Sequence, residues 1–184
     1  MKTPDPAHAP LSIRLAWLAA FVGASLLFTP GLGCEVPLIA FAAICGMRLA
    51  RREALLFAAT VWLTDELAGF ITWRYPMTHA GFGWPAAVGA AILAATWAAT
   101  SVARRTTGAA GIVAALLSAF AVSEGLLFAA GMLAGAVTQE AFTPAIVGRV
   151  LAFNAATFAG LLAVKALQPR NGRCAHGLRE VTGF

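Results

Sequence analysis

The segment EALLFAATVWLTDELAGFITW, residues 53–73, is almost wholly apolar. An α-helix of this length rises about 30 Å, which is the thickness of the hydrocarbon core of a bilayer. The composition of the segment therefore predicts a membrane-spanning helix. Asp65 and Glu66 nevertheless stand side by side within it. A charge at the bilayer centre costs roughly 3 kcal/mol or more unless it faces protein or water, so these two carboxylates are the first candidates for a functional site.

The rest of the chain has the same apolar character. Its 184 residues are 60% hydrophobic and 11% charged, and the mean hydropathy is +0.79. A soluble domain of this size cannot bury so much apolar surface, so we expect an all-α polytopic membrane protein. Cys34, Cys45 and Cys174 have neither paired nor metal-type spacing, which argues against a disulfide framework. The first apolar run lacks a signal-peptide cleavage site and is interpreted as a first span.

Six apolar runs are separated by short loops that contain Gly, Pro and Arg. Each run predicts one membrane-spanning helix, and together they predict a compact six-helix bundle that forms a single domain, residues 1–184. The second run is short for a full crossing, and the fifth is longer than a crossing needs. The predicted spans are approximately residues 11–28, 36–49, 53–73, 84–103, 108–137 and 144–167.

Lys and Arg gather on one side of the predicted bundle. Of the thirteen, only Arg74 and Arg149 fall on the opposite side. The positive-inside rule then places both termini in the cytoplasm. The net charge of +5 follows this topology signal rather than a nucleic-acid-binding pattern, so we expect no nucleic-acid partner.

Three predicted spans carry polar residues at a similar depth toward the outer face. Asp65 and Glu66 lie about 18–20 Å from the cytoplasmic end of their helix, and Glu124 lies about 24 Å from the end of its own. Arg149 and Asn154 lie about 8 and 15 Å below the outer face. This shared depth predicts an outward-facing polar pocket, with Arg149 as the counter-ion of Glu124 or Asp65. The alternative is that such pairs only hold helices together.

Aromatic residues near this depth have two interpretations. Trp62 lies one helical turn from Glu66 and is a candidate for the pocket wall. Tyr75 either contacts the ligand or belongs, with Trp73 and Trp84, to the aromatic belt at the membrane surface.

The predicted outer loops and the first span supply the remaining candidates. Cys34 and His79 offer a thiolate and an imidazole, which suit a transition metal such as cobalt, iron or zinc. Ala16, Ala20 and Ala24 recur at every fourth position of the first span. Small residues at this spacing allow another helix to approach closely, whether it belongs to a partner subunit or to the same chain.

These features together resemble the S components, the substrate-binding subunits of energy-coupling factor (ECF) vitamin transporters. The resemblance covers approximately residues 11–168, and it rests on the six short-looped spans, on AWLAAFVGA in the first span and on the outward polar residues. It implies that Ala16, Ala20 and Ala24 dock on an ECF coupling subunit with its ATPases. It also implies a vitamin site in the outer half, closed by two loops and formed by Cys34, Trp62, Asp65, Glu66, Tyr75, His79, Glu124 and Asn154.

Within that family, the chain looks most like the solitary cobalamin-type S components, which use a cysteine as an axial cobalt ligand. Here His79 lies in the loop between the third and fourth predicted spans, and Cys34 lies in the earlier loop. The resemblance implies that either one approaches the cobalt of a transported cobalamin or related corrinoid. It also implies a bacterial inner-membrane transporter with no intrinsic cofactor.

Two other classes of function remain open. A cation or proton pathway would use Asp65, Glu66 and Glu124 as a relay, but a relay needs ionisable groups across the whole membrane and these three lie in the outer half. A membrane enzyme or an assembly subunit is the other class. The sequence has no P-loop, HExxH, GxSxG or kinase motif that would favour an enzyme.

Overall fold

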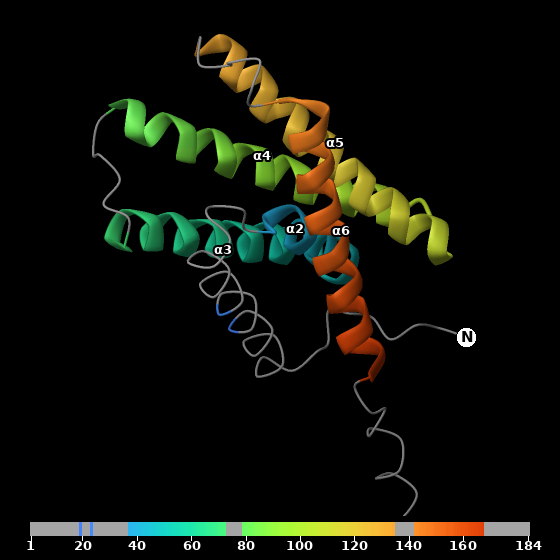
Figure 1. Cartoon of the computed structure of the whole chain (residues 1–184). Coiled ribbons are helices and arrows are strands. Elements are labelled where there is room, and N and C mark those ends of the chain that lie inside the picture. Colours follow the sequence, from blue (N-terminus) through green and yellow to red (C-terminus); the bar gives the residue numbers. More distant parts are fainter. Residues whose placement is uncertain (1–18, 20–22, 24–36, 73–78, 135–141, 168–184) are drawn as a thin grey trace, which may run out of the picture.

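The computed structural model of the chain describes residues 19, 23, 37–72, 79–134 and 142–167 (Figure 1). Five helices account for most of these residues, and no strand occurs among them. The all-α fold class is therefore confirmed for the described part of the chain. The helices are α2 (Leu38–Arg48), α3 (Arg51–Thr72), α4 (His79–Ala103), α5 (Gly108–Leu133) and α6 (Pro144–Leu167).

Helices α3 to α6 are each long and apolar enough to cross a membrane. They also carry large apolar side chains on their outer surfaces, such as Leu56, which is 68% exposed, and Ile71, which is 78% exposed. Outward-facing side chains of this size are stable where the surroundings are lipid rather than water. The four helices indicate a membrane-embedded protein. The predicted first span, residues 11–28, lies outside the described residues except for positions 19 and 23.

The described helices begin close to their predicted starts, with one exception. Helix α4 begins at His79, five residues before the predicted start at Trp84, so that Pro85 lies inside the helix. Proline favours the first turn of a helix, so its place inside α4 is less common. The extra turn has a packing partner, because Phe82 stacks on Phe70 of α3 with 5.1 Å between the ring centroids.

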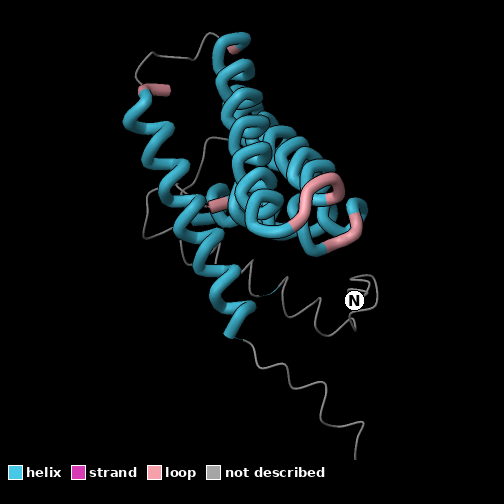
Figure 2. The backbone as a smooth tube through the Cα atoms, turned by 90° about the vertical axis from the view of Figure 1, so that its right-hand side faces the viewer, coloured by secondary structure: helices cyan, strands magenta, loops and turns pink. Residues whose placement is uncertain are grey.

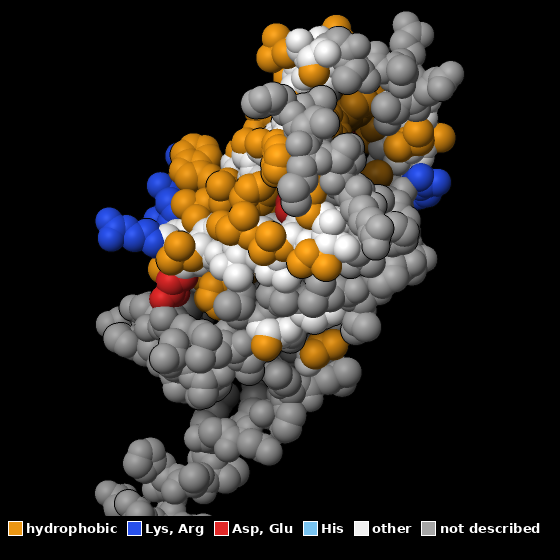
Figure 3. All heavy atoms as spheres, turned by 90° about the vertical axis from the view of Figure 1, so that its left-hand side faces the viewer, with side chains coloured by type: hydrophobic (Ala, Val, Ile, Leu, Met, Phe, Trp, Pro, Cys, Tyr) orange, Lys and Arg blue, Asp and Glu red, His pale blue; other side chains and the backbone are white. Residues whose placement is uncertain are grey.

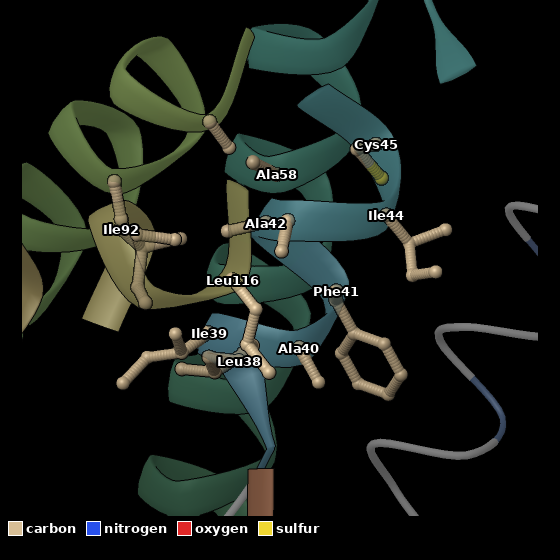
Figure 4. Close-up of a cluster of buried hydrophobic side chains, with 14 of the residues drawn as sticks. Leu38, Ile39, Ala40, Phe41, Ala42, Ile44, Cys45, Ala58, Ile92 and Leu116 are labelled. Carbon is tan, nitrogen blue, oxygen red and sulfur yellow. The ribbon is translucent and has the colours of Figure 1, made fainter. Parts of the chain in front are cut away.

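The second predicted span corresponds to α2, which is only 11 residues long. Such a helix rises about 16 Å, roughly half of the hydrocarbon core. Every residue from Leu38 to Gly46 is buried. Burial on all sides is expected of an apolar helix at the centre of a bundle. Around α2 lie α3, α4 and α5, and the close-up in Figure 4 shows its side chains among Ala58, Ile92 and Leu116 of these neighbours.

Small residues let α2 approach α4 closely. A Cβ atom on Gly46 would lie 2.9 Å from both the Ala99 Cβ and the Thr100 backbone nitrogen. The buried hydroxyls of Thr96 and Thr100 donate to carbonyls of their own helix, at 2.8 Å and 2.7 Å. The contact surface of α4 is therefore both flat and free of unsatisfied hydroxyl groups.

Helix α6 is attached differently. It crosses the other helices steeply and stands apart from them along much of its length (Figures 1 and 2). Its contacts are mainly with α2 and to a smaller extent with α5. Among its described side chains, only Asn154 and Phe158 are fully buried.

Candidate functional site

Helix α3 has an exposed stripe and a packed stripe on opposite sides. The buried residues Ala58, Val61 and Gly69 recur every three or four positions, and Asp65 falls in the same register. Asp65 itself is partly buried. The helix therefore directs Asp65 toward the packed side of α3. The exposed stripe consists of Arg52, Leu56, Thr60, Leu63, Leu67 and Ile71.

Glu66 lies beside the interface between α3 and α4. It is partly buried, one turn after Trp62 and one turn before Phe70. The Trp62 Nε1–H group donates to the Pro85 carbonyl oxygen across the interface, at 3.1 Å. The indole ring covers Gly89 so closely that a Cβ atom there would lie 2.5 Å from Trp62 Cε2. The ring is thus held in place by a glycine and by a carbonyl group of α4.

Asn154 connects α6 to the first turn of α2. Its Oδ1 accepts a hydrogen bond from the Ala40 backbone N–H at 3.0 Å, and its Nδ2 donates to the Val150 carbonyl at 3.0 Å. The first amides of any helix lack intrahelical acceptors, and the N-cap residue Pro37 supplies none from its side chain. The sequence predicted Asn154 as a pocket residue, with contacts between helices as the alternative, but no local pattern identifies Ala40, 114 positions away, as its partner.

Glu124 and Arg149 lie on helices α5 and α6, which have few or no contacts with α3 in the described part of the chain. Glu124 is partly buried, and on α5 it shares its register with the exposed residues Leu117 and Phe128. Helix α5 packs mainly on α4, whereas α3 packs on α4 and α2. Arg149 is exposed on α6. Of the predicted polar cluster, Trp62, Asp65 and Glu66 therefore share α3, whereas Glu124 lies on α5 in register with exposed residues.

Several predicted residues fall outside the described part of the chain. They are Ala16, Ala20, Ala24, Cys34 and Tyr75. His79 is the first residue of α4, but its side chain is not described. Among the His, Cys, Asp and Glu side chains that are described, no three converge to form a metal site. The metal contacts of Cys34 and His79 therefore remain predictions.

Sequence reasoning missed Pro85 and Gly89 as partners of Trp62, although a signal for them existed. Two helices joined by a short loop pair residues at equal distances from that loop. Phe70 with Phe82 and Trp62 with Gly89 both satisfy this symmetry about residues 73–78. A glycine opposite a tryptophan in such a hairpin predicts a seat for the indole ring.

The fold and the site together define the class of protein. In its described part the chain is all-helical, with four helices of the membrane-spanning type. Two neighbouring carboxylates lie on the packed side of α3 or beside it. Comparisons of the chain with protein-family models, with curated proteins and with solved structures found no match. Its function therefore has to be inferred from its own residues.

Proposed function

We propose that the protein is a membrane-embedded substrate-binding subunit for the uptake of a small vitamin, with cobalamin or a related corrinoid as the first candidate. The observation that carries this proposal is the register of α3. Asp65 aligns with buried residues and Glu66 with the α4 interface, while Leu63 and Leu67 occupy the exposed stripe. Ionisable groups in membrane helices that face protein instead of lipid commonly mark ligand pathways and counter-ion sites.

The setting of Trp62 supports a binding role. A ligand that lies over a flat aromatic ring loses less affinity when the ring is already ordered. Trp62 meets this condition, because Gly89 and the Pro85 carbonyl hold the indole before any ligand arrives. Asp65 and Glu66, three and four positions after Trp62 on the same helix, would then bind polar or cationic groups at the edge of the ligand.

The position of His79 in the chain is compatible with a contact to the ligand. His79 begins α4, one turn before Phe82, which stacks on Phe70 at the end of α3. His79 therefore lies at the end of the α3–α4 pair where α3 finishes, beyond Glu66. In this proposal His79 or Cys34 approaches the cobalt atom, and the segments that contain them cover the bound corrinoid.

Release of the vitamin completes the proposal. Docking through Ala16, Ala20 and Ala24 on an ECF coupling subunit with its ATPases would reorient the protein and open the site to the cytoplasm. The membrane would be the bacterial inner membrane, with both termini inside. These elements rest on the resemblance and on the distribution of Lys and Arg in the sequence.

An absorbance spectrum of the purified, detergent-solubilised protein tests the proposal after incubation with cobalamin and desalting. We expect retained corrinoid with a shifted spectrum, and loss of the shift in either His79→Ala or Cys34→Ala. Asp65→Asn and Glu66→Gln should weaken retention about tenfold, the usual loss of one charge-assisted hydrogen bond. Glu53→Gln is the matched control, because Glu53 lies about 18 Å from Asp65 along the same helix.

Two results would contradict the proposal at different levels. No retained colour would exclude cobalamin, and calorimetry with thiamin, biotin and riboflavin would follow. No binding of any vitamin at micromolar concentration would exclude the function itself.

A cation or proton pathway is the second candidate, favoured by the adjacency of two partly buried carboxylates in an apolar helix. A relay to Glu124 would have to pass from the packed side of α3 to α5, where Glu124 is in register with exposed residues. Dye-reported proton flux in proteoliposomes distinguishes the two. Flux that Glu66→Gln abolishes, without any vitamin binding, would favour the pathway.

A further inference from the structure

One end of the bundle carries a group of arginines that the proposed vitamin site does not use. We name it the arginine cluster. Two turns contribute to it, the α2–α3 turn and the turn after α4, and they are neighbours because Arg51 Nη2 donates to Ser101 Oγ of α4 at 3.5 Å. Figure 3 shows basic side chains grouped at one edge of the hydrophobic surface. The cluster consists of Arg48, Arg51, Arg52, Arg104 and Arg105.

The charges within this cluster are poorly balanced by the protein. Glu53 is the single acidic residue within the two turns and the adjoining first turn of α3, as far as the structure describes them. Arg48, Arg52, Arg104 and Arg105 are all exposed. Like charges held near one another repel, so an anion that binds between them is stabilised.

Arg51 gives the cluster a fixed centre. Its guanidinium carbon lies 5.5 Å from the centroid of the Trp97 ring, a cation–π contact, while its Nη2 is used by Ser101. Its Nε is buried and has no hydrogen-bond partner among the described residues. Buried donors are nearly always paired, and the described residues supply no acceptor for this one, so an anion that reaches it has to enter between the two turns and not rest on their surface. A phosphate oxygen is an acceptor that fits a guanidinium fork.

The cluster also lies at the correct depth for a lipid headgroup. Three apolar segments end or begin there, namely Arg51–Ile71, Phe82–Ala103 and Gly108–Leu133. Residues at the ends of membrane spans lie at the level of the lipid phosphates. Trp97 is 53% exposed on the adjoining surface of α4, where lipid chains would contact it.

We propose that the arginine cluster is a binding site for the phosphodiester headgroup of an anionic phospholipid. Arg51, oriented by Trp97 and Ser101, binds the phosphate, and the four exposed arginines surround it. This site is independent of the vitamin site, and it differs from a simple topology signal. Arginines that act only during membrane insertion retain no lipid in the purified protein.

Native mass spectrometry of the delipidated protein tests this site. The probes are phosphatidylglycerol and phosphatidylcholine of equal chain length, with inorganic phosphate as a competitor. We expect retained phosphatidylglycerol adducts and few phosphatidylcholine adducts. Since one basic residue near an anionic surface contributes about 1 kcal/mol, Arg51→Gln should weaken phosphatidylglycerol binding by about fivefold, and Arg104→Gln with Arg105→Gln by about 25-fold.

Two further variants keep the test decisive. Arg51→Lys preserves the charge and the insertion signal but removes the planar fork, and it should still weaken binding. Arg149→Gln, an exposed arginine on α6, is the matched control and should leave binding unchanged.

Equal retention of both lipids, or unchanged binding in Arg51→Lys and in the double variant, would overturn the proposal. Inorganic phosphate that displaces the lipid at equal concentration would also overturn it, because the site would then be one for a soluble phosphate.

Discussion

Helices α4 and α6 are both long enough to cross a membrane, yet they are held in the protein by opposite means. Helix α4 packs against α2, α3 and α5, with Gly46 of α2 pressed onto Ala99 and Thr100. Helix α6 crosses its neighbours and buries only Asn154 and Phe158 among its described side chains (Figure 2). Lipid tails are as apolar as the helices, so association depends on close packing and on interhelical hydrogen bonds. Helix α4 relies mainly on close packing, whereas α6 combines a smaller packed contact around Phe158 with the hydrogen bond of Asn154.

The comparison separates two uses of buried polar residues. The hydroxyls of Thr96 and Thr100 bond to their own helix and leave a smooth surface for packing. The Asn154 amide instead reaches another helix at Ala40. Helix α6 adds to this hydrogen bond a smaller packed contact, in which Phe158 is buried and Leu161 and Leu162 pack against the core. Helices α2, α4 and α5 therefore form the most extensively packed part of the described protein, and α6 is attached to it over a smaller area.

Gly46→Leu should have the largest effect on this comparison. The new side chain would meet the Thr100 backbone nitrogen and the Thr96 carbonyl oxygen, and neither can move without a shift of the whole of α4. We expect the free energy of unfolding to fall by about 3 kcal/mol. Circular dichroism during titration with sodium dodecyl sulfate measures that loss.

Gly160→Leu on α6 is the matched control for Gly46→Leu. No atom lies within 4 Å of a Cβ atom placed at Gly160. We expect a change below about 0.5 kcal/mol, as for most substitutions at unpacked surface positions. Equal losses in the two variants would contradict the distinction between α4 and α6.

The sequence predicted the helical elements well and their contacts poorly. Runs of apolar residues mark helices directly, so α3, α5 and α6 begin within two residues of their predicted starts. Helix α4 begins earlier than predicted, because the Phe82–Phe70 stack supports a turn that Pro85 disfavours. A tertiary contact decided that boundary, and local sequence preferences carry no information about it.

The candidate site was predicted only in part, for a similar reason. Helical spacing shows that Asp65 and Glu66 point in different directions from the axis of α3. Which of these directions faces protein depends on where α2 and α4 lie, and the spacing does not contain that information. Depth along each helix suggested that Glu124 joins them, whereas rotation of α5 about its axis places Glu124 in register with exposed Leu117. A single sequence gives the position of a residue along a helix, but it carries little information about that rotation.

Asn154→Leu tests the attachment of α6. The substitution removes the acceptor for the Ala40 amide and leaves that buried N–H group unpaired. Interhelical hydrogen bonds in membranes contribute about 0.6–2 kcal/mol, so we expect a loss of about 1–2 kcal/mol. Hydrogen exchange should accelerate in the first turn of α2 and remain slow along the α4–α5 interface. Uniform acceleration across all helices would show that Asn154 stabilises the whole fold and not the contact of α6 alone.

Thr100→Val should have the smallest effect, although Thr100 is as deeply buried as Asn154. Valine has nearly the shape of threonine, and the Thr96 carbonyl that loses the hydroxyl keeps its helical partner, the amide of residue 100. No buried group is left unpaired, so we expect a change in the free energy of unfolding below about 0.5 kcal/mol. The same titration that measures Asn154→Leu measures this variant. A loss as large as that of Asn154→Leu would mean that the hydroxyl contributes to contacts between helices, and the packing of α4 would then depend on polar bonds as α6 does.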